Sequence, residues 1–201
     1  MLFFSEKLNN YLIHKLGKYG ILWYNIGVIK SGEGVFIHKP FYFLLTKTEK
    51  IMKIVIANDH AAVDMKFKIK EYIESLGFEV INVGIDQNER CDYPDYAFKA
   101  CKKILNKEAD LGVLVCGTGI GMSIAANKIK GIRACACSET FSAKMCREHN
   151  DANVICFGER VIGIETAKEI VKTFLESKFQ GGNHLQRVNK IMEIEGGTYK
   201  E

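Results

Sequence analysis

From residue 53 onward, short apolar runs alternate strictly with segments of helical pattern, and this alternation limits the possible folds more than any other feature of the chain. Each apolar run has the length of a strand, and each is followed by a turn and by helical spacing or a helix-start signal. Strands that alternate with helices are joined by right-handed crossovers, which produce a parallel sheet covered on both faces. The expected strands are residues 54–57, 78–83, 110–116, 132–137 and 153–157.

We therefore predict an α/β fold of three layers: a Rossmann-like, five-stranded parallel sheet in the flavodoxin-like order 2-1-3-4-5, followed by a C-terminal helix over residues 184–195. In this order the chain reverses direction between its first and third strands. Ligands of such sheets bind where the loops after those two strands separate. Here the two loops are Asn58-Asp59-His60 and Cys116-Gly-Thr-Gly-Ile-Gly121, so polar side chains and a glycine-rich turn border the expected crevice.

The first part of the chain does not share this pattern. Residues 1–52 hold 10 of the 21 aromatic residues, and Met52 stands directly before the first expected strand. We interpret residues 1–51 as an N-terminal extension that is poorly ordered or results from a mis-called start. The alternative is an aromatic-rich segment that covers an oligomer face. The main domain is expected over residues 52–197, with residues 198–201 as a tail.

Charge and cysteine usage exclude several classes of protein. Residues 1–52 carry seven Lys and three Asp or Glu, whereas the other 149 residues carry 21 charges of each sign, so the main domain has no electrostatic footprint for nucleic acid. No apolar run approaches the ~18 residues of a membrane span, and no secretory signal is recognisable. The seven Cys include no CxxC pair and no cluster with zinc-ligand spacing. We expect a cytoplasmic protein without a metal site, a nucleic-acid partner or a membrane partner.

The glycine-rich turn after the third strand has the form of an anion cradle. Its backbone N–H groups and the positive end of the following helix point at one place. The spacing Gly117-x-Gly119-x-Gly121 is not a dinucleotide fingerprint, and no Walker sequence follows it. A small phosphate or an enolate oxygen is therefore a better ligand than a dinucleotide. The alternative is tight packing of strand on helix with no ligand.

Cys116 and the Asp59-His60 pair are the candidate reactive groups at this crevice. Cys116 is either an inert core thiol or, because it precedes a helix N-terminus, a thiolate that can act as a nucleophile or a general base. His60 can donate a hydrogen bond to a phosphate or sugar oxygen. Asp59 can bind a sugar hydroxyl, orient His60, or simply cap the first helix.

Three further positions are less specific. His149-Asn150-Asp151 is a polar run before an apolar strand, which is compatible with a catalytic loop and equally with an ordinary one. Arg160 and Arg187 are single arginines, and single arginines are usually solvated. They become candidates only if the fold brings them to the same site.

Several separate motifs, in the right order, resemble those of the type B ribose-5-phosphate isomerases, within the sugar-phosphate isomerase family that also contains the galactose-6-phosphate isomerase subunits. The resemblance runs from about residue 52 to about residue 197 and does not include residues 1–51. The motifs are Asp59-His60, Arg90-Cys-Asp-Tyr-Pro94, Cys116-Gly-Thr-Gly-Ile-Gly-Met-Ser-Ile-Ala-Ala-Asn-Lys128, Gly131-Ile-Arg-Ala134, His149-Asn-Asp-Ala-Asn-Val154, Phe157-Gly-Glu-Arg-Val161 and Gly181-Gly-Asn-His-Leu-Gln-Arg187.

The resemblance implies roles for individual residues. Cys116 corresponds to the general base, and His149 to the acid that opens the sugar ring. No metal and no organic cofactor is implied. Asn183 stands where the family usually has Arg, which weakens the expected grip on the phosphate. The implied substrate contacts are Asp59, His60, Gly117, Thr118, Gly119, Ile120, Gly121, Asn150, Arg160, Asn183 and Arg187.

The implied activity is the aldose–ketose isomerisation of ribose 5-phosphate to ribulose 5-phosphate through an enediolate, in the pentose phosphate pathway. Allose 6-phosphate or galactose 6-phosphate is an alternative substrate, and a non-catalytic phosphosugar-binding module is an alternative function. The resemblance also implies a homodimer, or a dimer of dimers, in which the His149-Asn150-Asp151 loop crosses the interface to complete the partner's active site. The sequence does not decide between these two assemblies.

Overall fold

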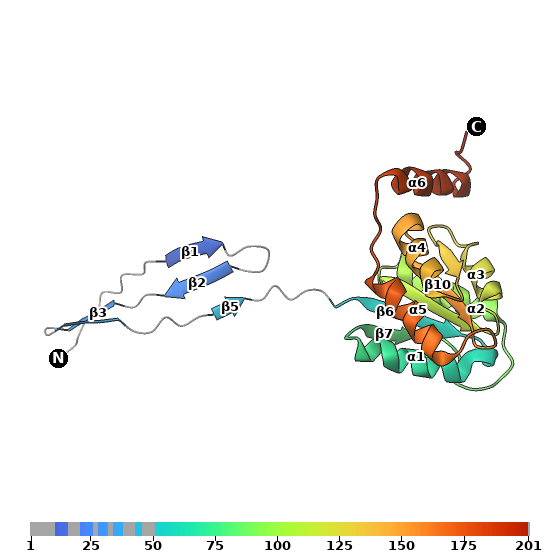
Figure 1. The fold of residues 1–201 in the computed structure, drawn as a ribbon, viewed down its shortest axis with the longest axis horizontal. Coiled ribbons are helices and arrows are strands. Elements are labelled where there is room, and N and C mark those ends of the chain that lie inside the picture. Colours follow the sequence, from blue (N-terminus) through green and yellow to red (C-terminus); the bar gives the residue numbers. More distant parts are fainter. Residues whose placement is uncertain are drawn as a thin grey trace. The chain divides into compact units, whose positions relative to one another are not determined.

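The chain divides into two units, Met1–Lys50 and Ile51–Glu201 (Figure 1). A computed structural model describes the backbone of residues 11–15, 21–25, 28–31, 34–37 and 43–45, and residues 51–200 with their side chains. The interpretation of residues 1–51 as a poorly ordered extension or a mis-called start falls largely outside these described residues and stays a prediction.

The described residues of the first unit are strands. One antiparallel sheet has the order β1-β2-β5, and a separate antiparallel pair consists of β3 and β4. Their bounds are Tyr11–Lys15 for β1, Ile21–Asn25 for β2, Val28–Ser31 for β3, Gly34–Ile37 for β4 and Phe43–Leu45 for β5.

The second unit contains a parallel five-stranded sheet with helices on both faces, as the alternation of apolar runs and helical segments predicts (Figure 1). Its strands are β6 (Lys53–Asn58), β7 (Glu79–Asn82), β8 (Leu111–Cys116), β9 (Ala134–Ala136) and β10 (Val154–Gly158). Its helices are η2 (His60–Ala62), α1 (Val63–Ser75), α2 (Tyr93–Leu105), α3 (Ile120–Ala126), α4 (Thr140–Asn150), α5 (Ile164–Glu176) and α6 (Asn183–Glu195). In the described part of the chain, no helix combines the length and the apolar character needed to cross a lipid bilayer.

The predicted order of the last two strands is wrong. The sheet has the order β7-β6-β8-β10-β9, which is 2-1-3-5-4 when its strands are numbered along the chain. All five residues of β10 are buried, so this strand needs a neighbour on each side, whereas β9 has three residues and is only partly buried. A short, partly exposed strand is suited to the edge of a sheet.

The corrected order decides which helices share a face. Because right-handed crossovers place a helix on the face set by the direction of travel, the step back from β9 to β10 puts α4 on the same face as α1 and α5. Helices α2 and α3 cover the other face. Alternate residues of each strand supply the two cores, so Ile54 and Ile56 of β6 pack toward α1 and α5, while Val55 packs toward α2.

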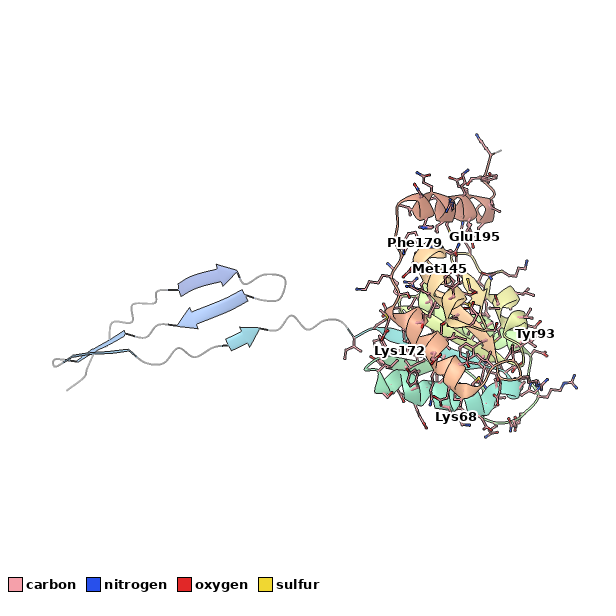
Figure 2. The ribbon with its side chains drawn as sticks, viewed as in Figure 1. Lys68, Tyr93, Met145, Lys172, Phe179 and Glu195 are labelled. Carbon is pink, nitrogen blue, oxygen red and sulfur yellow. The ribbon has the colours of Figure 1, made fainter. Side chains whose placement is uncertain are left out.

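Helix α6 is the least integrated element of the second unit. It contacts α4, and Val188 is its only buried residue. Leu185, Ile191 and Ile194 are exposed apolar side chains on this helix. In Figure 2, Glu195 marks the last turn of α6, and Tyr93 marks the first turn of α2. These two helices belong to different parts of the candidate site.

Candidate active site

Cys116 ends the buried strand β8 and lies directly before the N-terminus of α3. Its side chain is 4% exposed. The Gly119 backbone N–H donates a hydrogen bond to Cys116 Sγ at 3.0 Å. An N–H group aimed at sulfur stabilises a thiolate more than a thiol, because the hydrogen bond to the charged form is the stronger one. This contact is compatible with the reactive thiol that we expect from the sequence, and the role of Cys116 stays a prediction.

The turn that follows Cys116 can adopt its shape only with glycine at residue 119. Gly119 has φ +79°, and a Cβ atom there would lie 2.7 Å from the Cα of Phe157 in β10. Left-handed φ and close backbone contact both exclude a side chain. The turn therefore packs closely on the end of β10, and this packing fixes the arrangement of its N–H groups.

Arg160 is brought to this turn by the chain that leaves β10. The Arg160 N–H donates to the Gly117 carbonyl at 3.1 Å. Arg160 Nη1 lies 3.7 Å from the position that a Cβ atom would take on Gly117, and Ala61 lies on the same side of the turn at 3.8 Å. A guanidinium group at the mouth of an anion cradle provides a counter-charge for a phosphate.

The loop after β6 lies beside the end of β8, where the Asp59 N–H donates to the Val115 carbonyl at 3.3 Å. Asp59 is 7% exposed, and its Oδ1 accepts the N–H of Ala61 at 3.0 Å, so this carboxylate caps η2. His60 Nδ1 accepts the backbone N–H of Cys91 at 3.4 Å. Since a backbone N–H can only donate, the neutral His60 ring carries its proton on Nε2 and presents it as a donor.

The Tyr93 ring lies against the glycine turn after Cys116. This contact was not predicted from the sequence. A Cβ atom on Gly121 would lie 2.8 Å from Tyr93 Cζ, so the ring packs directly on the glycine turn. Tyr93 and Cys91 both belong to the motif Arg90-Cys-Asp-Tyr-Pro94. Their place in this motif is the sequence feature that could have assigned both residues to the site. The helical or strand spacing of neither residue predicts its contacts.

His149 and Asn150 lie in the last turn of α4, where the helix ends at Asp151 with φ 46°. The His149 ring stacks on the His184 ring of α6, with centroids 4.0 Å apart and an interplanar angle of 5°. Helix α6 also carries Asn183 and Arg187, both exposed. His184 is the second functional candidate that the sequence analysis missed, since nothing in its spacing predicts that it faces His149.

Loss of hydration lowers the pKa of His184, and the charges of His149 and Arg187 lower it further. The ring of His184 is therefore held in the neutral form over a wider pH range than an exposed histidine. A neutral ring is the better partner for stacking on His149, because two imidazolium rings repel each other.

The structure separates these residues into two groups instead of one site. In β10, Val154 pairs with Gly112 of β8, and Gly158 pairs with Cys116. His149 and Asn150 immediately precede β10, so they lie at the amino end of the strands, whereas Cys116 lies at the carboxyl end. The strand β10 between these two ends rises by four residue steps of ~3.3 Å, or ~13 Å.

The carboxyl-edge group consists of Asp59, His60, Cys116, Gly117, Thr118, Gly119, Ile120, Gly121 and Arg160. The amino-edge group consists of His149, Asn150, Asn183, His184 and Arg187. The described residues include no group of three or more His, Cys, Asp or Glu side chains placed to hold a metal ion.

Comparisons with known proteins agree with the resemblance seen in the motifs. Residues 54–191 match the family model described as Ribose/Galactose Isomerase. The chain is 48% identical to ribose-5-phosphate isomerase B of Escherichia coli over 143 residues, which are 71% of this chain and 96% of that protein. It is 43% identical to D-erythrulose-4-phosphate isomerase of Pectobacterium atrosepticum over 142 residues, 70% of this chain and 93% of that protein.

A solved structure has the same fold. Ribose-5-phosphate isomerase B of Clostridium thermocellum superposes with a TM-score of 0.72 at 47% sequence identity, covering 74% of this chain and 100% of that one. The order of motifs, the family model and the fold therefore lead to one conclusion: the chain belongs to the ribose/galactose isomerase family.

Proposed function

We propose that this protein is an aldose–ketose isomerase that interconverts ribose 5-phosphate and ribulose 5-phosphate, as a cytoplasmic enzyme of the pentose phosphate pathway. The observation that carries the proposal is Cys116 Sγ, which accepts the Gly119 N–H at the start of α3, at the same edge of the sheet as His60 and Arg160. Relatives named ribose-5-phosphate isomerase B support the choice of substrate.

The reaction moves one proton between neighbouring carbons. His149 assists opening of the furanose ring, which frees the aldehyde. The Cys116 thiolate then removes the proton from C2 and returns it to C1, while a proton passes from the C2 hydroxyl to the C1 oxygen. The enediolate oxygen faces the N–H groups of the glycine turn, which can contribute ~3 kcal/mol per donor to the transition state. His60, Arg160 and Arg187 hold the phosphate, and Thr118 binds a substrate hydroxyl.

We further propose that two copies of the chain form each active site. The carboxyl-edge group and the amino-edge group lie at opposite ends of the parallel strands, and this placement argues against one chain applying Cys116 and His149 to the same sugar carbons. Exposed apolar side chains on α3 and α6, among them Ile120, Ile124 and Ile194, offer surface for such an assembly. A homodimer or a dimer of dimers fits this arrangement.

Asn183 favours a second candidate substrate. It is exposed at the start of α6, one helical turn before Arg187, at the position where Arg is usual in the family. One cation fewer near the phosphate fits a larger sugar such as allose 6-phosphate or galactose 6-phosphate, whose additional hydroxyls supply other contacts. A relative that acts on erythrulose 4-phosphate indicates that the substrate varies within this family.

The test is turnover of the full chain on ribose 5-phosphate, allose 6-phosphate and galactose 6-phosphate, with Cys116→Ala as the inactive control. We expect the highest kcat/KM on ribose 5-phosphate, and a lower KM for this substrate in Asn183→Arg. If kcat/KM is higher on a six-carbon sugar phosphate than on ribose 5-phosphate, the six-carbon sugar phosphate is the preferred substrate. Thermal stabilisation by these sugars without any turnover would instead identify a non-catalytic binding module.

A further inference from the structure

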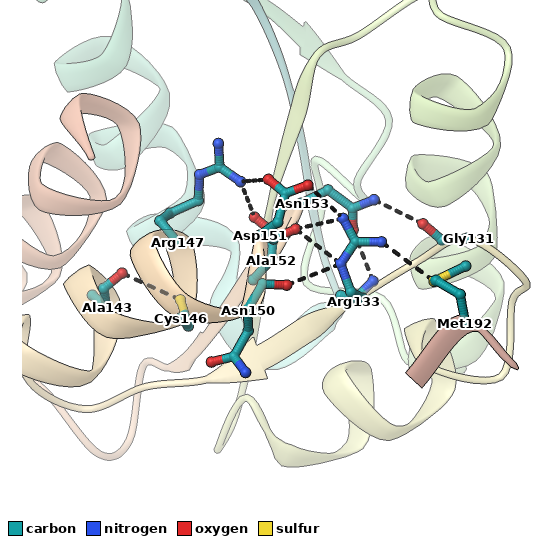
Figure 3. A network of polar contacts seen from close by, with 10 residues as sticks. All are labelled: Gly131, Arg133, Ala143, Cys146, Arg147, Asn150, Asp151, Ala152, Asn153 and Met192. Carbon is teal, nitrogen blue, oxygen red and sulfur yellow. Dashed lines mark hydrogen bonds and ion pairs between the residues drawn. The ribbon is translucent and has the colours of Figure 1, made fainter. Parts of the chain in front are cut away.

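We infer that Arg133 is a positioning residue for the isomerase reaction: it holds the end of α4 so that His149 and Asn150 keep one orientation. The inference rests on the proposed function, because it assigns to Arg133 the support of the ring-opening step. Arg133 lies just before β9, within the motif Gly131-Ile-Arg-Ala134, and the spacing of this motif does not predict its contacts. Its contacts carry the assignment (Figure 3).

The guanidinium group of Arg133 binds the carbonyl groups at the C-terminus of α4. Arg133 Nε donates to the carbonyl oxygens of Asn150 and Asp151, both at 3.0 Å, and Nη2 donates to the Asp151 carbonyl at 2.7 Å. The last carbonyls of a helix have no partner within the helix. A cationic fork that binds two of them fixes the direction of the final turn, which is the turn that carries His149 and Asn150.

The backbone at this point needs such support. Asp151 has φ 46°, a left-handed conformation that residues other than glycine adopt less readily. Its carboxylate binds Arg133 Nη2 at 2.9 Å and Arg147 Nη1 at 2.8 Å. The two arginine side chains are only 18% and 14% exposed, so these ion pairs are less screened by water than pairs on an open surface.

Arg133 also touches the helix that carries the second ring of the histidine stack. Arg133 Nη1 lies 3.6 Å from Met192 Sδ in α6. The neighbouring Gly131 N–H donates to both carboxylate oxygens of Glu195 at 3.0 Å. One side chain therefore contacts the end of α4 and the side of α6, and His149 and His184 stack where these two helices meet.

Arg147 offers a matched control. It binds the same Asp151 carboxylate, but its other contacts are the Ala152 carbonyl at 2.7 Å and the ring of Phe174, 5.7 Å from its guanidinium carbon. It donates no hydrogen bond to the Asn150 or Asp151 carbonyls. If Arg133 only stabilised the fold, loss of either arginine would have similar consequences for the reaction.

The reaction itself separates positioning from stability. Ribose 5-phosphate is a closed ring, whereas ribulose 5-phosphate is open, because the oxygen that would close its furanose ring carries the phosphate. Exchange of the C1 hydrogen of ribulose 5-phosphate with deuterated solvent therefore needs Cys116 but not ring opening. A misplaced His149 should slow turnover of ribose 5-phosphate and spare this exchange.

The experiment compares Arg133→Met, Arg133→Lys and Arg147→Met in the full chain. For Arg133→Met we expect kcat on ribose 5-phosphate to fall about 100-fold while C1 exchange stays within about threefold, since a displacement of ~1 Å is enough for such a loss. Arg133→Lys should recover part of kcat, because it keeps the charge. Arg147→Met should lower Tm but change both rates equally. Equal losses of the two rates in Arg133→Met, or an unchanged kcat, would overturn the inference.

A spectroscopic measurement tests the same inference without substrate. Stacking shifts the ring protons of His149 and His184 upfield, and NMR should find this shift lost in Arg133→Met and kept in Arg147→Met. Retention of the shift in Arg133→Met would overturn the positioning role even if the protein turned over another sugar. If the unmodified chain shows no turnover but Arg133→Met loses the upfield shift, the proposed function is rejected. The role of Arg133 in positioning His149 is then kept.

Discussion

At the scale of single residues, the proposed mechanism depends on which thiol is reactive. Burial raises the pKa of the Cys101 thiol to about 12, and complete burial raises the pKa of Cys156 well above its usual value. Both thiols stay protonated at neutral pH, whereas Cys116 receives an N–H bond at a helix N-terminus. Of these three thiols, Cys116 is the one whose backbone contacts suit a base.

Replacing Cys116 by alanine should abolish catalysis without unfolding the protein. We expect turnover to fall by at least about 10³-fold, within the range that a general base contributes. The measurement is exchange of the C2 hydrogen of ribose 5-phosphate in deuterated water, followed by NMR. Cys101→Ala is the matched control and should keep its kcat despite some loss of stability. Normal exchange in Cys116→Ala would disprove the assignment of the base.

Gly119→Ala tests the geometry of the turn beside this thiol. The added Cβ would lie 2.7 Å from the Phe157 backbone at φ +79°, so we expect a loss of at least about 2 kcal/mol in unfolding free energy. Gly163→Ala is the control, since Gly163 has φ −75° and no atom within 4 Å of the added Cβ. Denaturant titration measures both. Equal stabilities of the two variants would contradict the described turn.

The sequence predicted the residues of this turn but not all of their contacts. An apolar strand that runs into three glycines indicates a strand, a tight turn and a helix, and this prediction is confirmed. For Asp59 the sequence left sugar binding and helix capping open, and the structure shows its Oδ1 as a cap. The packing of Tyr93 on Gly121 depends on how α2 crosses the sheet, which no local pattern encodes.

At the scale of elements, the strand order was the part of the fold that local patterns did not predict correctly. Alternation predicts parallel strands and right-handed crossovers, but it is equally compatible with 2-1-3-4-5 and 2-1-3-5-4. The difference lies in burial: β10 is buried along its whole length, and β9 is short and partly exposed. The contrast between Val-Ile-Cys-Phe-Gly158 and Ala-Cys-Ala136 was the available signal.

Helix α6 should dock less firmly at low pH. Its His184 has a pKa below the ordinary value of 6.5, first because of lost hydration and then because of the charges of His149 and Arg187. The folded arrangement thus favours the neutral ring. Its contribution is complete above pH 6.5 and is lost as the pH falls through the lower pKa of the docked ring.

NMR titration of the histidine ring protons measures this effect. We expect the His184 signal to titrate below 6.5 and the upfield shift from the stack to disappear over the same range of pH. His184→Gln should remove this pH dependence of α6 docking. Titration of His184 at or above 6.5 would contradict the packing of α6 on α4.

At the scale of the whole molecule, the motifs predicted the family, and the shared site that the resemblance implies stays a proposal, which the placement of two residues supports. A helix that precedes a parallel strand ends at the amino edge of the sheet, so α4 must deliver His149 to the edge opposite Cys116. The motifs contain both His149 and Cys116, but they do not show at which edge of the sheet each residue lies. This separation is what makes a second copy necessary in the proposed mechanism.

Complementation between two inactive variants tests whether two copies of the chain form each active site. Cys116→Ala lacks the base, and His149→Ala lacks the ring-opening acid, so each homodimer should be inactive on ribose 5-phosphate. A heterodimer, isolated through two different affinity tags after co-expression, contains one site with both residues intact. We expect its kcat to be about half that of the unmodified dimer, as two-fold symmetry requires. A heterodimer no more active than either homodimer would contradict the proposal that two copies form each site.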